Sequence, residues 1–282
     1  MKKLSKQQIK KLLPIYKGQT PLELQFALEL QYAYHDENPF GKTNDAHVYA
    51  DNAEYPNILL ITGSMWGVQL MGNATIDEYD DDLHNFIMNQ FDLLADEHKN
   101  LLLNLCSPGW EDKINKMFDG YVKDKIIRYN YRLNIETYNN LPKLRDKIPK
   151  GFEMNYFDSD SVDFLDKYNY DRVFWSPESK RFGFALVKNG EKISDCICVY
   201  YEKEAYNSNA ANVIEIGVGT KEDYRRQGHA FLSCMAFIEY CLSNGYEPNW
   251  GCWNYNPESQ ALAKKLGFEE ISRRSVLIIK NN

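Results

Sequence analysis

The chain has 282 residues, of which 44% are hydrophobic and 26% are charged, and its formal net charge at pH 7 is −7. This length can bury a sizeable core and favours about two domains. Contacts with phosphates need a concentrated basic surface, so the acidic balance argues against a nucleic-acid partner and favours a cationic one such as an amine. No basic apolar leader opens the chain and no run of about 18 apolar residues occurs, which predicts a cytoplasmic protein without a membrane partner.

The cysteines and histidines predict no metal site. The six cysteines lie inside apolar runs and form no Cys-x-x-Cys pair, and the five histidines do not cluster with them. We therefore expect reduced core residues rather than a disulfide framework or a zinc centre. The cysteines are Cys106, Cys196, Cys198, Cys234, Cys241 and Cys252.

The first half of the chain alternates helical and strand patterns. Ser5 can cap a first helix, and Thr20-Pro21 can begin a second. The hydrophobic spacing then changes from one period to the other several times. The expected order is helices at 6–16 and 22–34, strands at 47–50, 57–62 and 67–71, a helix at 83–94, a strand at 100–106, a helix at 108–117 and a strand at 121–134.

The second half repeats this order with little shared sequence. Its expected elements are a strand at 152–157, a helix at 159–168, strands at 182–188, 193–201 and 213–220, a helix at 227–243, a strand at 247–253, a helix at 257–266 and a strand at 268–279. The match predicts an α/β (α+β) protein made of two copies of one mixed-sheet architecture. We expect domains at 1–140 and 141–282, with a junction from Asn139 to Pro149.

The stretch from Tyr224 to Ala230 has the features of an anion site. It joins the strand pattern at 213–220 to a helical pattern and contains two arginines, Gly228 and then a small residue. The first N–H groups of a helix have no partner inside it, and the helix dipole adds positive potential there. Gly228 allows a positive φ or a close backbone approach. The stretch therefore predicts a site for a phosphate or pyrophosphate.

The same residues resemble the acyl-CoA loop of the GNAT acetyltransferase superfamily, in the order Arg225-x-x-Gly228-x-Ala230 after a strand that ends at Thr220. The stretch from Trp253 to Phe268 resembles the later Asn…Leu-Gly-Phe motif of that superfamily. The resemblance implies acetyl-CoA (coenzyme A) as the acetyl donor and two GNAT-like mixed-sheet domains, the C-terminal one with the acyl-CoA loop. The residues it implies for the cofactor are Val218, Gly219, Thr220, Arg225, Arg226, Gln227, Gly228, His229, Ala230, Asn256 and Ser259.

Within that superfamily, the tandem arrangement and the stretch from Tyr240 to Asn256 resemble the zwittermicin A resistance group of acetyltransferases. This resemblance implies transfer of an acetyl group to an amine. The N-terminal copy lacks the loop, because an acidic stretch from Gly72 to Asp82 stands in its place and its carboxylates would repel a pyrophosphate. We expect a degenerate N-terminal domain and a catalytic C-terminal one.

Glu215 is the predicted catalytic base. An amine is protonated at neutral pH, so a proton must leave before the nitrogen can attack a thioester. Glu215 lies on the strand that leads to the loop, among apolar neighbours in which a carboxyl group holds a proton more tightly than in water. The alternative reading is a strand carboxylate in an ion pair or in solvent. No general acid is evident, because Ala263 stands where many GNAT enzymes carry a tyrosine.

Three functions are compatible with these features. The first is an acetyl-CoA-dependent N-acetyltransferase that acts on a primary amine of a small molecule, such as an aminated antibiotic or metabolite. The second is a regulatory protein that binds coenzyme A without turnover. The third is a tandem GNAT-like enzyme that transfers acyl or aminoacyl groups to peptides or cell-wall precursors, which the lack of a basic tRNA-binding surface weakens.

Overall fold

The computed structural model describes residues 1–16, 21–35, 46–63, 67–93, 100–142, 148–171, 175, 181–201 and 212–280. The elements up to the predicted junction are β1 (Lys2–Lys3), α1 (Lys6–Leu12), α2 (Pro21–His35), β2 (His47–Ala50), β3 (Ile58–Thr62), β4 (Val68–Gly72), α3 (Asp80–Asn89), the 3₁₀ helix η1 (Gln90–Leu93), β5 (Asn100–Leu105), α4 (Trp110–Met117), β6 (Val122–Leu133) and α5 (Ile135–Asn139). None of the described helices is long and apolar enough to cross a membrane.

The second half follows the expected order closely. Its elements are β7 (Phe152–Asp158), α6 (Val162–Lys167), β8 (Phe182–Lys188), β9 (Glu191–Tyr201), β10 (Val213–Thr220), the 3₁₀ helix η4 (Glu222–Tyr224), α7 (His229–Ser243), β11 (Glu247–Trp253), α8 (Pro257–Lys265) and β12 (Phe268–Lys280). Local chemistry explains several boundaries. Ser5 and Gln8 form a capping box at α1, and Asn256 caps α8 ahead of Pro257.

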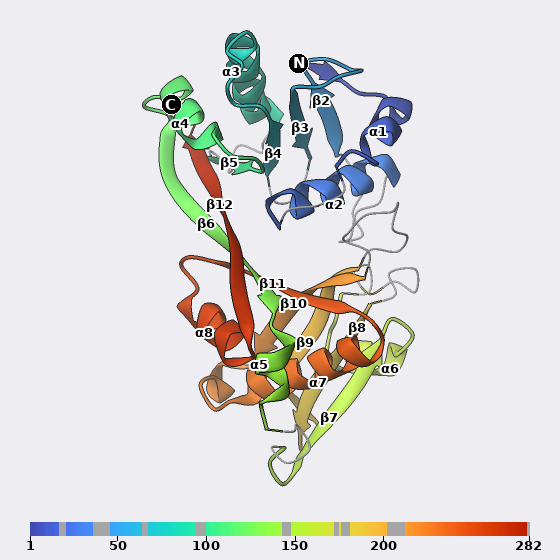
Figure 1. Ribbon diagram of the computed structural model, residues 1–282. Helices are drawn as coiled ribbons and strands as arrows, with labels where there is room; N and C mark the ends of the chain where they lie inside the picture. Colours follow the sequence, from blue (N-terminus) through green and yellow to red (C-terminus); the bar gives the residue numbers. More distant parts are fainter. Residues whose placement is uncertain are drawn as a thin grey trace.

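The twelve strands of the described residues form one continuous sheet in the order β1-β2-β3-β4-β5-β12-β6-β11-β10-β9-β8-β7. The two long strands β6 and β12 connect the upper and lower halves in Figure 1. β6 lies between β11 and β12, so a strand from the first half sits inside the second half of the sheet. The end of β12 pairs with β5 from Val276 to Lys280 and so completes the first half.

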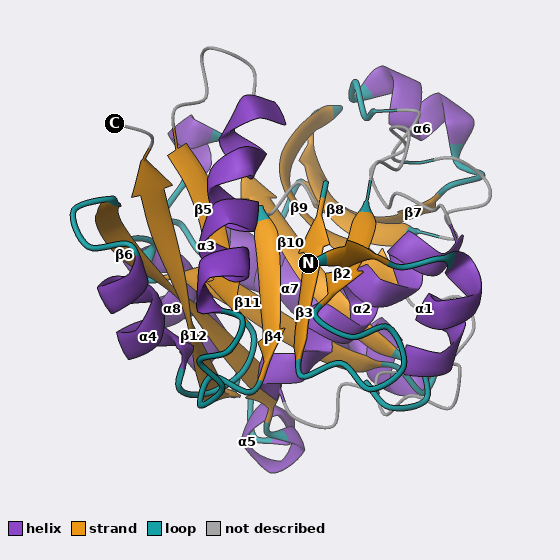
Figure 2. Ribbon diagram, turned by 90° about the horizontal axis from the view of Figure 1, so that it is seen from above, coloured by secondary structure: helices purple, strands orange, loops and turns teal. Residues whose placement is uncertain are grey.

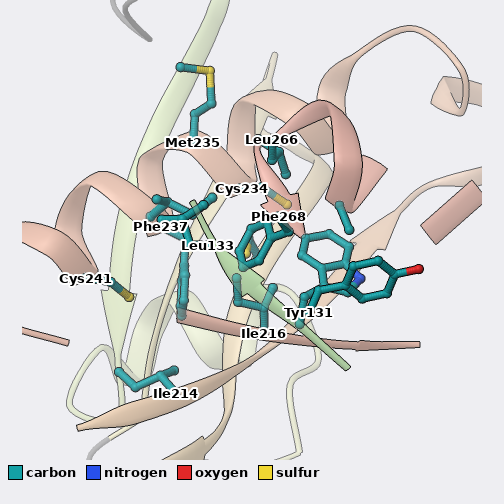
Figure 3. Close-up of a cluster of buried hydrophobic side chains, with 14 of the residues drawn as sticks. Tyr131, Leu133, Ile214, Ile216, Cys234, Met235, Phe237, Cys241, Leu266 and Phe268 are labelled. Carbon is teal, nitrogen blue, oxygen red and sulfur yellow. The ribbon is translucent and has the colours of Figure 1, made fainter. Parts of the chain in front are cut away.

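Helices cover both faces of this sheet, as Figure 2 shows from above. Directly opposed residues of an antiparallel pair share a face, which traces each face through β6 and β12. On one face, α7 and α8 cover the core drawn in Figure 3, and α3 and α4 cover a second core that includes Leu277 and Ile279. On the other face, α1 and α2 cover a third core, while Phe157, Leu165 and Trp175 form a fourth.

The structure confirms the expected order of the elements and the mixed α/β class, and it adds β1, α5 and the two 3₁₀ helices. The first helix ends at Leu12 rather than at residue 16, because the residue before Pro14 is disfavoured in a helix. The sequence did not indicate the placement of β6, because strand patterns carry no information about which strands are neighbours. The domain boundary at residue 140 stays a prediction, and hydrogen-bonded strands cross it in both directions.

His229 begins α7 as a buried residue, 6% exposed, and neither ring nitrogen has a hydrogen-bond partner among the described residues. Its ring stacks on Phe152 at 5.0 Å between centroids. Burial, and then the charge of Lys188, lower the pKa of His229. The neutral imidazole is therefore part of the packing at the start of the helix.

A substitution at Leu277 tests whether β12 contributes to the stability of the core under α3 and α4. Leu277 is 1% exposed and packs in that core. Leu277→Ala should lower the free energy of unfolding by about 2–5 kcal/mol in urea titrations, because it leaves a cavity. The control Ile271→Ala lies on the same strand at 38% exposure and should change it by about 0.5 kcal/mol or less. Equal effects would contradict the packing of β12 against α3 and α4.

His229 predicts a pH dependence of stability. Above pH ~6.5, the ordinary value, the imidazole is neutral in both the folded and the unfolded chain. Below it, the unfolded chain binds a proton that the folded chain does not, so stability should fall as the pH drops toward the lowered folded pKa. Melting temperatures from pH 8 to pH 5 should fall less steeply for His229→Phe than for the parent protein. Identical slopes would show that this histidine protonates equally well in the folded state.

Candidate active site

Strands β10 and β11 lie side by side only at their beginnings. Their parallel register runs from the Val213–Glu247 pair to the Glu215–Asn249 pair, and the described residues of the two strands form no later pair. β10 keeps its other neighbour, β9, as far as Thr220. Beyond Glu215, the edge of β10 that faces β11 has no strand partner. The strands therefore separate along the stretch that contains the predicted cofactor residues Val218, Gly219 and Thr220.

The loop after β10 has an unusual backbone. Arg226 and Gly228 have left-handed φ values of 60° and 86°. The Arg225 side chain donates to the Thr220 carbonyl oxygen at 3.3 Å, and the Gln227 amide donates to the Asp223 carbonyl oxygen at 2.9 Å. These hydrogen bonds connect the loop side chains to nearby backbone groups and so restrict the conformation of the loop. Residues 225–228 are all exposed, so their charges and amides face outward.

The start of α7 supplies unpartnered amides at the end of this loop. The helix begins at His229 without a side-chain cap, and an early helical bond runs from the Leu232 N–H to the Gly228 carbonyl at 3.3 Å. The first N–H groups of the helix, at residues 229–231, have no partner inside it. A Cβ on Gly228 would meet nothing within 4 Å, so a ligand can approach the backbone. These features fit the pyrophosphate of acetyl-CoA.

Asn256 and Ser259 lie at the start of α8, where their side chains have structural partners. The Asn256 Oδ1 accepts from the Ser259 N–H at 3.1 Å, and the Ser259 Oγ accepts from the Trp250 indole N–H at 3.1 Å. The first bond caps α8, and the second ties α8 to β11. The predicted contact of the two residues with the cofactor stays a prediction.

Glu215 lies at the point where the two strands separate. Its carboxylate accepts a short hydrogen bond from the guanidinium of Arg128 on β6, and both side chains are 13% exposed. The side chain is thus in the ion pair that the sequence reading left open, although its neighbours along the strand are apolar as expected.

Arg128 is itself held from two sides. Its guanidinium lies over the Trp253 ring, 5.1 Å from the centroid, and a Cβ on Gly251 would come within 2.5 Å of its Nη2. Only glycine leaves room for the guanidinium at that position. Sequence analysis missed Arg128 because it lies 87 residues before Glu215. The alternation of Arg128, Asn130 and Arg132 along β6 is the signal that could have drawn attention to a polar face.

No general acid is evident at this point among the described side chains. Ala263 is fully buried in the core. Four tyrosines of the second half, Tyr200, Tyr201, Tyr240 and Tyr255, could replace the missing tyrosine by sequence. Tyr240 packs against Phe182 and Phe184, and Tyr255 stacks on Trp253 with 64% exposure. The side chains of Tyr200 and Tyr201 lie outside the described residues.

The first half contains the counterpart of this site with different chemistry. β4 and β5 pair in parallel, and α3 and α4 follow them as α7 and α8 follow β10 and β11. A cavity of about 810 Å³ lies at the starts of α3 and α4 and is lined by several aspartates. Lys113 binds the Ile76 carbonyl oxygen, Asp77 and Asp80 across it. Protein groups thus occupy the place that a phosphate would need.

The chain matches known acetyltransferases over most of its length. The family model of GNAT acetyltransferases matches residues 42–277. A relative from Bacillus subtilis (strain 168), described as the uncharacterized N-acetyltransferase YdfB, is 26% identical over 238 residues, which are 81% of this chain and 84% of that protein.

Solved structures share the fold across the whole chain. The tandem GNAT protein from the clavulanic acid biosynthesis pathway has a TM-score of 0.64 at 10% identity, over 99% of this chain and 97% of its own. A GCN5-related N-acetyltransferase-like protein from Streptococcus suis 89/1591 has a TM-score of 0.59 at 19% identity, over 98% and 99% of the two chains. Acetyltransferases of this kind generally use acetyl-CoA. The chain belongs to the GNAT acetyltransferase family and is an N-acetyltransferase.

Proposed function

We propose that this enzyme transfers the acetyl group of acetyl-CoA to a primary amine of a small molecule, and that its single transfer site lies in the second half of the chain. The observation that carries the proposal is the position of Glu215, where β10 and β11 separate beside the loop with unpartnered amides. A proton acceptor and an anion site at the two ends of one short strand segment suit this reaction.

Acetyl-CoA supplies the acetyl group as a thioester. The amides at the start of α7 would hold its pyrophosphate, and Arg225 and Arg226 would add positive charge. Glu215 would accept a proton from the ammonium group of the acceptor, directly or through water, and so free the nitrogen lone pair. Arg128 would orient the Glu215 carboxylate. We assign the first half to shaping the acceptor site, because its own counterpart loop is closed by Lys113 and rich in aspartate.

The assignment of the donor site is tested at Gly228. Gly228→Leu should weaken acetyl-CoA binding at least about tenfold in calorimetry, since a side chain there enters the space in front of the amides. Gly245→Leu is the matched control, because Gly245 also has a positive φ and an open Cβ position but lies beyond the other end of α7. Both variants carry similar backbone strain. Equal affinities in the two variants would refute the site, and a stoichiometry of two would refute the single site.

The role of Glu215 is tested by replacing it with glutamine. Glu215→Gln keeps the shape of the side chain but accepts no proton, so the rate of thiol release from acetyl-CoA with an accepted amine should fall by about 10²–10⁴. Acetyl-CoA affinity should change little. Glu270→Gln is the control, since Glu270 is also paired with an arginine, Arg273, but lies on the opposite face of the sheet. Full activity of Glu215→Gln would assign proton removal to water or another residue, and no thiol release with any amine would favour a protein that binds coenzyme A without turnover.

A further inference from the structure

A second arginine, Arg274 on β12, lies next to the pair of Arg128 and Glu215. The register of β6 and β12 places Arg274 directly opposite Arg128, so the two side chains leave the same face of the sheet. Helix α2 contacts β12 on this face, and Figure 1 shows α2 between the upper half and the strands that carry the site. Arg274 therefore lies at the boundary of the two halves, beside the predicted acceptor site.

The placement of Arg274 is costly for the folded protein. The residue is 5% exposed, and its Nε has no hydrogen-bond partner among the described residues. A directly opposed like charge, Arg128, adds repulsion. Burial is the main cause that lowers the pKa of the Arg274 guanidinium, and the charge of Arg128 lowers it further against the opposing effect of Cys106. A buried guanidinium donor left without a partner is unusual and calls for an anion.

Two carboxylates come within electrostatic range of this guanidinium. Glu215 and Glu29, a buried residue of α2, both favour its charged form. Glu215 is engaged by Arg128. An acceptor that carries both an ammonium and a carboxylate group would bring a proton for Glu215 and an anion for Arg274 in one molecule, whereas a simple amine brings no anion for the arginine.

We propose that Arg274, together with Arg128, binds a carboxylate of the acceptor, and that the acceptors of this enzyme are therefore amino acids or related compounds that carry both an amine and a carboxylate. The planar guanidinium of Arg274 presents its Nε and a neighbouring Nη to the two oxygens of a carboxylate. The amine of the same molecule then lies on the Glu215 side of the arginine pair. This inference rests on the proposed function, and it narrows the class of acceptor.

Matched acceptor pairs test this class. The probes are amino acids and the amines that result from loss of their carboxylate, assayed by thiol release from acetyl-CoA with the full chain. The carboxylate member should be preferred by about 10- to 100-fold in kcat/KM, the range of a charged hydrogen bond lost from a buried site. Arg274→Met should reduce this preference toward one, mainly through KM, and Arg274→Lys should restore only part of it. Preference for the amine member, or a preference unchanged by Arg274→Met, would overturn the inference.

Arg273→Met is the control for these assays. Arg273 is the preceding residue, but it points to the opposite face, where it binds Glu270 and lies over the Tyr129 ring. The acceptor preference of Arg273→Met should equal that of the parent protein. An equal loss of preference in Arg273→Met and Arg274→Met would show a general disturbance of β12 and would also overturn the inference.

A binding measurement without turnover separates this inference from the proposed function. Thermal shifts with the same amino acids in the presence of coenzyme A, each taken relative to the same variant without the amino acid, should show stabilisation of the parent protein and of Arg273→Met and none of Arg274→Met. If no member of any pair releases thiol, the proposed function fails while the binding result still decides the inference. Equal stabilisation of the parent protein and of Arg274→Met would overturn the inference.

Discussion

The pairing of β6 with both β11 and β12 is the constraint on which the site depends. A strand in the interior of a sheet must bond to a neighbour on each side, since an unpaired buried backbone group is costly. β6 meets this condition with two strands from the other half of the chain, and β12 in turn completes the sheet next to β5. This exchange fixes the two halves to each other and places Arg128 beside Glu215. The second half of the sheet is therefore complete only with a strand from the first half.

The separation of β10 and β11 is the feature of the sheet on which the proposed binding site rests. As long as the two strands pair, their backbone groups are satisfied by each other, and beyond Glu215 those groups become available to a ligand. The left-handed residues Arg226 and Gly228 then turn the chain so that α7 points its first amides at the same place. Both features use backbone groups, so they depend on the fold more than on particular side chains.

The two halves share one arrangement of strands and helices but differ in the charges at the corresponding helix starts. The first half has the same parallel strand pair followed by helices, but three aspartates occupy the first turn of α3 and Lys113 bridges Asp77 and Asp80. Negative charge at a helix start is favourable for the helix and unfavourable for a bound phosphate. The charges that stabilise α3 therefore oppose the binding that α7 permits. The first half still contributes β6 and α2 to the face of the sheet that carries Glu215.

Local sequence patterns were enough to predict the order of the elements, and they predicted an anion site in the loop after residue 220. These depend on local rules: hydrophobic period, capping at Ser5 and Asn256, and the glycine that allows the left-handed turn at position 228. It also identified Glu215 as a candidate, because a carboxylate on an otherwise apolar strand is unusual. Only the tertiary structure decided the partner of Glu215, the burial of Arg274 and the position of β6 in the sheet. The side-chain contact between residues as distant as Arg128 and Glu215 depends on which strands lie near each other after the whole chain has packed, and no local pattern encodes that choice.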